Sequence, residues 1–137
     1  MPNSVDTELI PSRGWILGSR AFVDSLTEYP DAAVIVDMIG DADLNIYMEK
    51  NSNLQIINEV WAAANTLGYS KQFIPGYKWS MTDDHTPFLL AGIPAIDIID
   101  FDYPYWHTVE DTPDKVSAAS LKVVGDTLMQ WLTNSTP

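Results

Sequence analysis

Short apolar runs that alternate with longer amphipathic segments constrain the fold of this chain more than any other feature of its sequence. Residues 32–40 and 95–99 are apolar and rich in β-branched side chains, which is typical of strands buried on both faces of a sheet. Residues 14–29, 53–67 and 117–133 carry apolar side chains at helical spacing. The order of these segments predicts an α/β protein, a three-layer α/β/α sandwich around a mixed, mainly parallel sheet.

Three shorter segments complete a predicted order of helix, strand, strand, helix, strand, helix, strand, helix. Residues 43–50 alternate apolar and polar side chains, which predicts a half-exposed strand. A short strand is also predicted over residues 72–74, ending at a turn formed by Pro75-Gly76. Thr86 is expected to cap a short helix over residues 87–91, which begins with proline.

The central and final helices have well-defined apolar stripes. Asn51 or Ser52 is expected to cap the central helix, and Gly68 is expected to end it. Trp61 on its stripe is expected to be a core residue. The side chains predicted to face the core from these two helices are Leu54, Ile57, Val60, Trp61 and Ala64 and, later in the chain, Leu121, Val124, Leu128 and Trp131.

Length and composition limit the classes of function. The 137 residues fit one domain, in which residues 1–13 and 134–137 are expected to be poorly ordered. Without cysteine, the chain offers a metal only oxygen and nitrogen ligands. Its 19 acidic and seven basic residues give a net charge of −12, so we expect neither nucleic acid nor an anionic membrane as a partner. No apolar run approaches the roughly 20 residues of a membrane span, and no feature predicts a compartment.

Three polar clusters follow the predicted strands. Asp37 lies near the end of the first strand, residues 83–85 read Asp-Asp-His, and a long loop after the last strand contains Trp106-His107 and Glu110-Asp111. Ligands are held at the carboxyl ends of strands in α/β proteins. Carboxylates and imidazole are also the ligands that zinc accepts when no thiol is present. The clusters therefore indicate metal-assisted hydrolysis or proton transfer.

Each of these residues also has a purely structural interpretation. A buried Asp37 could be satisfied by a hydrogen bond, and a histidine such as His107 is more often a hydrogen-bonded structural residue than a ligand. His85 could pair with either neighbouring aspartate or with the backbone, in a supporting role. An acidic protein also offers many carboxylate pairs of the kind that glycosidases use, so a glycosidase stays open as a less favoured alternative.

Four sequence segments together resemble one known group of enzymes. Residues 36–41 read VDMIGD, residues 83–100 read DDHTPFLLAGIPAIDIID, residues 106–112 read WHTVEDT, and residues 17–22 read LGSRAF. In this order and spacing they resemble the zinc aminopeptidase and glutaminyl cyclase superfamily, peptidase clan MH. The resemblance extends from about residue 14 to residue 132 and implies the zinc-exopeptidase fold.

The resemblance implies roles for several residues. His107 matches a histidine that ligates zinc. Asp37 matches an aspartate that binds a second metal in two-zinc aminopeptidases or joins a proton relay in single-zinc cyclases. Asp83 matches the relay aspartate of the cyclases, and Trp106 matches a tryptophan of the pocket for the substrate N-terminus.

Other side chains in the same segments are assigned to the site by position. The aromatic side chains of Phe101 and Tyr103 are expected to help bind the substrate. Asp84, His85 and Asp111 are expected to support the site from behind the residues that touch substrate or metal. Zinc, as one or two ions, is the implied cofactor, and a peptide N-terminus is the implied substrate.

The chain also departs from the family pattern. The family's earlier half supplies a His-x-Asp metal motif, which does not occur here, and then an adjacent acidic pair. Glu8 could occupy the general-base position of that pair, but Leu9 would then replace a metal ligand. The sequence therefore resembles the carboxyl-terminal half of the enzyme. We expect the chain alone to bind zinc weakly, because catalytic zinc sites usually have three protein ligands.

Two interpretations of function follow. The favoured one is a zinc-dependent aminopeptidase-like or glutaminyl cyclase-like domain that acts on peptide N-termini and is incomplete as this chain. The alternative is a non-catalytic fragment or degenerate paralogue that keeps the fold and self-associates. In both, a strand that is central in the whole fold would have an unpaired edge, so a homo-oligomer is expected.

Overall fold

The computed structural model describes residues 14–135, and Glu8 lies outside this range. The order of its elements is the predicted one, so the α/β fold class is confirmed. The elements are α2 (Leu17–Ser25), β1 (Ala33–Asp37), β2 (Ile46–Glu49), α3 (Leu54–Thr66), β3 (Phe73–Trp79), α4 (Thr86–Leu90), β4 (Ala95–Ile99), a short 3-10 helix (Pro113–Lys115) and α5 (Ala118–Ser135).

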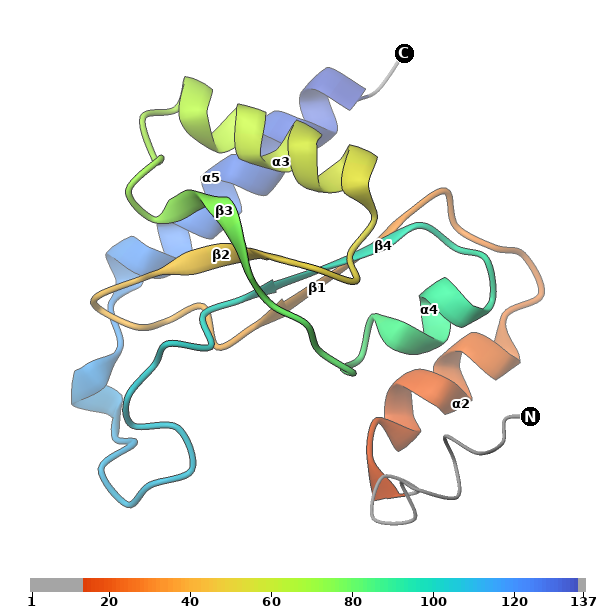
Figure 1. Ribbon diagram of the computed structural model, residues 1–137, viewed down its shortest axis with the longest axis horizontal. Coiled ribbons are helices and arrows are strands. Elements are labelled where there is room, and N and C mark those ends of the chain that lie inside the picture. The colour runs from red at the N-terminus through yellow and green to blue at the C-terminus, as the bar shows by residue number, and fades with distance from the viewer. Residues whose placement is uncertain (1–13, 136–137) are drawn as a thin grey trace.

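The strands form two parallel pairs that lie beside each other in a mixed arrangement (Figure 1). β1 pairs with β4 and β2 pairs with β3, each in parallel. β2 runs opposite to β4, because Asn45 before β2 donates to Asp100 after β4, whereas Asn53 after β2 donates to Ala95 at the start of β4. The two backbone nitrogens lie 2.9 Å and 2.8 Å from their acceptors. The expectation of a mixed, mainly parallel sheet is therefore met.

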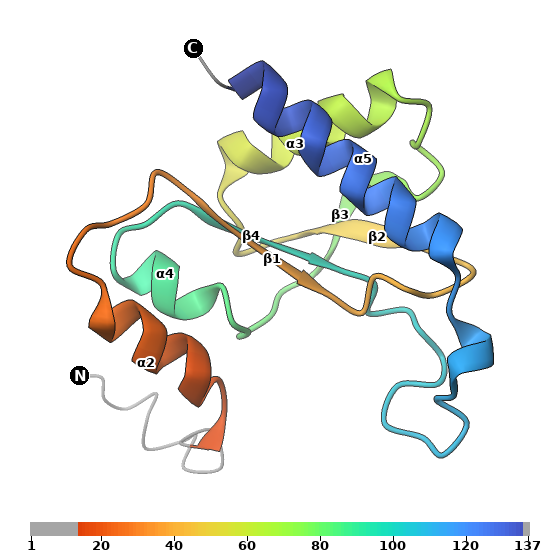
Figure 2. The same ribbon diagram turned by 180° about the vertical axis from the view of Figure 1, so that it is seen from behind.

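Helices cover the two faces of β4. Ile96 and Ile98 point into a core that α3 and α5 build. Ala95 points to the opposite face, where it packs with Val23 of α2 and Phe88 of α4. Figures 1 and 2 show α3 and α5 on one side of the strands and α2 and α4 on the other. This alternation follows from the period of two along a strand.

β1 is less buried than the sequence predicts. Its residues are partly exposed rather than buried on both faces, and the side chain of Val36 keeps 45% of its surface. The reason is positional. Within residues 14–135, β4 is the only strand that pairs with β1, so β1 is an edge strand. The self-association predicted to cover this edge stays a prediction.

β3 is longer than predicted and runs through the expected Pro-Gly turn. Tyr47 pairs with Ile74 and the next residue, Met48, pairs with Tyr77, so Pro75-Gly76 bulges out of register. Proline cannot donate a backbone hydrogen bond to a neighbouring strand, and a bulge is a place where a sheet tolerates it. The turn prediction was therefore wrong.

Details of the helices also differ from the prediction. Asn53, rather than Asn51 or Ser52, caps α3 by accepting from the backbone nitrogen of Ile56 at 3.0 Å. Thr86 does not cap α4; its hydroxyl accepts a hydrogen bond from the backbone nitrogen of Asp83.

The apolar stripes were mostly right. Leu54 and Leu121, which the predicted stripes place in the core, are exposed, and each lies in the first turn of its helix. Trp61 and Val124 are buried as predicted, and Gly68 follows α3 in the left-handed region. α5 extends to Ser135. None of the helices within residues 14–135 has the length and apolar character of a membrane span.

Candidate functional site

A cavity of about 440 Å³ lies where β1 and β4 end. Asp37 and Ile99, the last residues of these two strands, both line it. Segments far apart in the sequence supply further lining side chains, which include Asp83, Asp84, Phe101, Trp106 and His107. The cavity therefore lies at the carboxyl edge of a parallel pair, where α/β folds place ligands.

Three residues at this cavity have backbone angles that non-glycine residues rarely adopt. Ile16, Met38 and His107 have φ values of 54°, 53° and 57°, and all three line the cavity. No other non-glycine residue within 14–135 has a positive φ. A left-handed non-glycine residue costs on the order of 1–3 kcal/mol, and such residues gather at functional sites.

Aromatic rings build one wall of the cavity. The rings of Trp106 and His107 are stacked, with centroids 4.0 Å apart and planes 18° from parallel. Phe101 meets Trp106 edge-on at 5.0 Å. Tyr103 lies in an adjoining cavity of about 150 Å³, where its hydroxyl donates to Asp111 at 2.7 Å. The loop after β4 thus presents a flat aromatic surface beside an imidazole.

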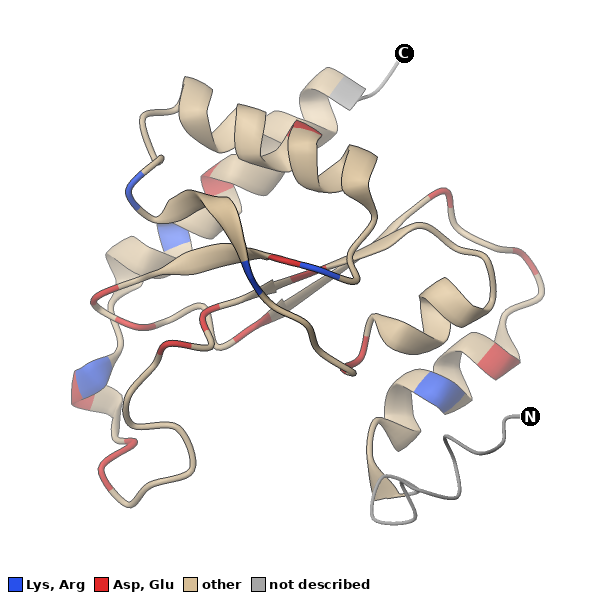
Figure 3. Ribbon diagram, viewed as in Figure 1, with Lys and Arg blue, Asp and Glu red and all other residues tan. Residues whose placement is uncertain are grey.

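Carboxylates line the same cavity. Burial, followed by the negative charge of Asp83, raises the pKa of Asp37 above its usual value. Burial and the charge of Asp83 also raise the pKa of Asp84. Figure 3 shows that Asp and Glu residues recur in the loops of the molecule, whereas Lys and Arg residues are few and separated. A proton or a cationic group beside these carboxylates would relieve the repulsion.

The described residues do not form a complete metal site. Asp37 and His107 carry oxygen and nitrogen donors that suit zinc, and both line the cavity. Within residues 14–135, however, no three His, Asp, Glu or Cys side chains are grouped closely enough to hold a metal ion. The donor chemistry fits zinc, but the number of donors does not.

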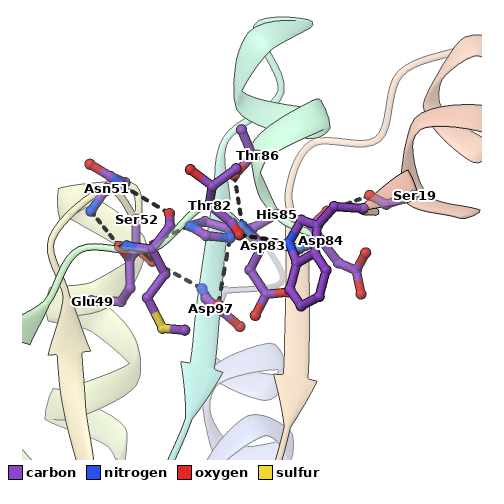
Figure 4. Close-up of polar contacts among 12 residues, drawn as sticks. Ser19, Glu49, Asn51, Ser52, Thr82, Asp83, Asp84, His85, Thr86 and Asp97 are labelled. Carbon is purple, nitrogen blue, oxygen red and sulfur yellow. Dashed lines mark hydrogen bonds and ion pairs between the residues drawn. The ribbon is translucent and has the colours of Figure 1, made fainter. Parts of the chain in front are cut away.

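A buried network lies directly behind the cavity (Figure 4). Glu49 and His85 are 1% and 0% exposed, and Glu49 Oε1 lies 2.9 Å from His85 Nε2. The same carboxylate accepts hydrogen bonds from the backbone nitrogens of Asn51 and Met81 and from the hydroxyl of Ser52. Burial alone would raise the pKa of Glu49, but these hydrogen bonds outweigh it and lower the pKa. Glu49 is therefore ionised at neutral pH, and we assign His85 Nε2 as a donor to it.

Asp97 faces the other nitrogen of the same imidazole. Asp97 Oδ2 lies 3.6 Å from His85 Nδ1, beyond hydrogen-bond distance, and Asp97 is fully buried. Burial, followed by the negative charge of Asp83, raises the pKa of Asp97 to about 9. The carboxyl group of Asp97 is therefore protonated at neutral pH. Glu49, His85 and Asp97 form a buried series that ends beside Asp83 at the cavity.

The comparisons with known proteins identify the family. The sequence model of peptidase family M28 matches residues 8–132, which is most of the chain. The chain belongs to peptidase family M28. A 41-residue segment is also 46% identical to an uncharacterized protein of Saccharomyces cerevisiae, covering 29% of this chain and 11% of that protein.

Solved structures of the same fold include both peptidases and cyclases. The glutaminyl cyclase of Porphyromonas gingivalis is 30% identical with a TM-score of 0.82, over 91% of this chain and 50% of that chain. A leucine aminopeptidase precursor of Bacteroides thetaiotaomicron is 32% identical with a TM-score of 0.85, over 91% and 46%. A zinc-dependent exopeptidase of Parabacteroides distasonis is 28% identical with a TM-score of 0.83, over 98% and 47%. This M28 chain spans about half the length of these structures, which agrees with the predicted resemblance to one half of the enzyme.

The structure brings most of the predicted site residues of this M28 chain together. The residues that line the main cavity are Asp37, Asp83, Asp84, Phe101, Trp106 and His107. Tyr103 and Asp111 lie in the adjoining cavity, and Glu8 is outside the described residues. His85 pairs with neither of its neighbouring aspartates, as was considered, but with Glu49. The catalytic, substrate-binding and metal-binding roles of these residues stay predictions.

The sequence analysis missed Glu49 and Asp97 as parts of this M28 site. Glu49 ends a strand whose alternating pattern predicts that its polar residues face solvent. Its register shifts relative to β3 on either side of Met48, so the strict alternation fails and Glu49 turns inward. Asp97 lies between isoleucines in an apolar run, and this position could have identified it from the sequence. A lone carboxylate in a buried strand is costly unless a proton or a polar partner compensates its charge.

Proposed function

We propose that this chain is the carboxyl-terminal part of a zinc-dependent M28 enzyme that acts on peptide N-termini. The observation that supports it most directly is that Asp37, Asp83 and His107, from three distant segments, line one cavity. In this proposal His107 and Asp37 are two of the zinc ligands. At least one further ligand and the general base come from residues outside 14–135, since the described donors are too few.

The lining of the cavity suits the N-terminus of a peptide. An N-terminal amine is cationic below its pKa, and Asp37 and Asp84 offer negative charge in the cavity. Trp106 and Phe101 present an apolar surface in the same cavity, on which the first side chain of the peptide would pack. The enzyme would then either hydrolyse the first peptide bond or cyclise an N-terminal glutamine, and the solved relatives include proteins of both kinds.

The buried carboxylates would hold protons for this reaction. Asp83 lies at the cavity with Asp97 behind it, and Asp97 is protonated at neutral pH. Asp83 is thus the candidate proton carrier, and Asp97 and His85 position it.

Zinc binding by the purified chain tests the proposal. We expect calorimetric titration to show weak zinc binding that His107→Ala lowers at least about tenfold, because an incomplete set of ligands still includes the imidazole. Glu110→Gln is the matched control, because Glu110 is an exposed acid in the same loop that does not line the cavity. Zinc binding that is insensitive to His107→Ala would refute the proposal.

The alternative is a non-catalytic member of the family that keeps the fold. The incomplete set of metal donors within residues 14–135 favours it. Stoichiometric metal in protein purified without chelator would support the enzyme, whereas a chain that binds zinc no better than His107→Ala would support the alternative. Turnover of peptides with N-terminal leucine or glutamine is expected to be very low for the chain alone in either case.

A further inference from the structure

Two side chains from β3 hold the start of the loop that follows β4. The ring of Trp79 on β3 meets the ring of Phe101 edge-on, with centroids 5.1 Å apart and planes at 83° to each other. The neighbouring Lys78 donates hydrogen bonds to both carboxylate oxygens of Asp102, at 2.9 Å and 2.8 Å. Two adjacent residues of the sheet thus contact two adjacent residues of the loop.

A bulge in β3 lets both side chains reach the same loop. In a regular strand, adjacent side chains such as those of Lys78 and Trp79 point to opposite faces. Met48 of β2 pairs with Tyr77, and the next residue of β2 pairs with Trp79. Lys78 is therefore an extra residue on β3, and bulges of this kind re-aim side chains. The ammonium group of Lys78 lies 5.2 Å from the centroid of the Trp79 ring, within cation–π range.

A continuous series of rings leads from Trp79 to the imidazole of His107. Phe101 meets Trp106 edge-on, with centroids 5.0 Å apart, and Trp106 stacks on His107 at 4.0 Å. The last three of these side chains line the cavity, whereas Trp79 does not line it and contacts it through Phe101. We call Trp79, Phe101, Trp106 and His107 the ring series.

The imidazole of His107 depends on this series for its orientation. Within residues 14–135, no hydrogen bond or ion pair involves its ring nitrogens, and the stack on Trp106 is its ring contact. A histidine that ligates a metal is ordinarily oriented by a hydrogen bond to its second nitrogen. The backbone of His107 also has a strained φ of 57°, and residues 101–111 contain neither helix nor strand. Packing of rings must therefore supply the orientation.

We propose that Trp79 is a positioning residue for His107, which fixes the plane of the imidazole through Phe101 and Trp106. Aromatic pairs favour particular mutual orientations, so a fixed ring at one end restricts the next ring in the series. Trp79 is itself fixed in the sheet, because its carbonyl accepts a hydrogen bond from the backbone nitrogen of Lys50 at 2.7 Å. The positioning needs no metal, whereas its consequence for zinc binding rests on the proposed function.

Proton NMR of the zinc-free chain tests the positioning. The chain has two histidines, so the imidazole resonances of His107 are identified by their loss in His107→Ala. Stacking on the face of an indole shifts ring protons upfield, and we expect this shift in the unaltered chain. Trp79→Leu should remove at least about half of the shift, because leucine is apolar but offers no ring edge. Trp79→Phe should retain it.

The controls separate positioning from a general loss of structure. Tyr77→Leu is the matched control, since Tyr77 is an aromatic residue of the same strand, is 44% exposed and lies outside the ring series. The resonances of the buried His85, which is paired with Glu49 of β2, report whether the sheet is intact and should not move. Lys78→Met is a second variant, which releases Asp102 and keeps all four rings. It should shift the His107 resonances in the same direction by a smaller amount.

Calorimetric titration with zinc measures the consequence for the metal. Trp79→Leu should weaken zinc binding at least about threefold, because an imidazole that samples several planes must be ordered before it binds the ion. Trp79→Phe and Tyr77→Leu should leave the affinity unchanged.

Two NMR results would overturn the inference. One is that the His107 resonances stay in place in both Trp79→Leu and Lys78→Met, and the other is that the His85 resonances move as far as those of His107. If Trp79→Leu leaves zinc binding unchanged while His107→Ala weakens it, the consequence for the metal is wrong. If the His107 resonances respond as expected but His107→Ala does not change zinc binding, the positioning stands and the proposed function fails.

Discussion

Glu49 provides the sharpest test of the buried network behind the cavity. Its carboxylate is 1% exposed and accepts four hydrogen bonds, at 2.8 to 3.0 Å, from Asn51, Ser52, Met81 and His85. Glu49→Ala leaves these donors without their acceptor. Each buried unsatisfied donor costs about 1–3 kcal/mol, but such costs do not add within one network.

The loss of a whole buried hydrogen-bond network gives a better total. Such a loss is among the most destabilising changes that a single substitution makes, at about 3–5 kcal/mol. A domain of this size has a free energy of unfolding of about 5–15 kcal/mol in all. Glu49→Ala should therefore remove a large share of the stability of the chain. Glu49→Gln should cost less, about 2 kcal/mol, because it keeps the volume and one acceptor oxygen.

Urea unfolding followed by circular dichroism measures these differences. Glu28→Ala is the control, because Glu28 is exposed in the segment after α2 and the same atoms are removed. It should change the free energy of unfolding by less than about 0.5 kcal/mol. If Glu49→Ala unfolded within about 1 kcal/mol of the unaltered chain, the buried network would not be what holds β2 to the loop before α4.

Three further predictions concern other buried or loop side chains. Asp97→Asn should raise the free energy of unfolding at both pH values, and the increase at pH 8 should exceed that at pH 5 by about 1–4 kcal/mol. Asp97 must take up a proton when the chain folds, so the unaltered chain loses stability as pH rises from about 4 towards 9. An equal effect at the two pH values would contradict this. Trp61→Ala should cost about 3–5 kcal/mol in urea unfolding, because the indole packs edge-on against Phe73 and donates to Ile74, and a loss below about 1 kcal/mol would refute this. Asp111→Asn should lower the pKa of Tyr103 from about 12, because the hydrogen bond to Asp111 is the main cause of its elevation; an unchanged tyrosinate absorbance titration would refute that cause.

The regular elements were predictable because they depend on short-range patterns. The apolar run at β4 and the helical stripes that contain Trp61 on α3 and Val124 on α5 are set by periods of 2 and 3.6 residues, which can be counted in a sequence. β1 could be located in the same way, but its exposure could not. Whether an apolar strand is interior or at an edge depends on which other strands are present, and that is a property of the whole sheet.

The cavity was predictable only in part. Asp37, Asp83 and His107 were recognised as a combination because each follows a strand and the motifs resemble those of a known superfamily. The partner of His85 was not predictable, since Glu49 reaches it through an irregular register between β2 and β3. A bulge changes which way a side chain points, and periodicity contains no information about bulges.

Backbone strain at the cavity bears on what the cavity is for. Ile16, Met38 and His107 adopt left-handed angles, and together they cost on the order of several kcal/mol that packing elsewhere must offset. All three line one cavity, where Trp106 and Phe101 also contribute aromatic rings. Strain at three points around a single group of carboxylates and an imidazole is typical of a site shaped for a ligand. The distribution of strain therefore supports a ligand-binding role for this cavity, which both the enzyme and a non-catalytic member that keeps the fold would share.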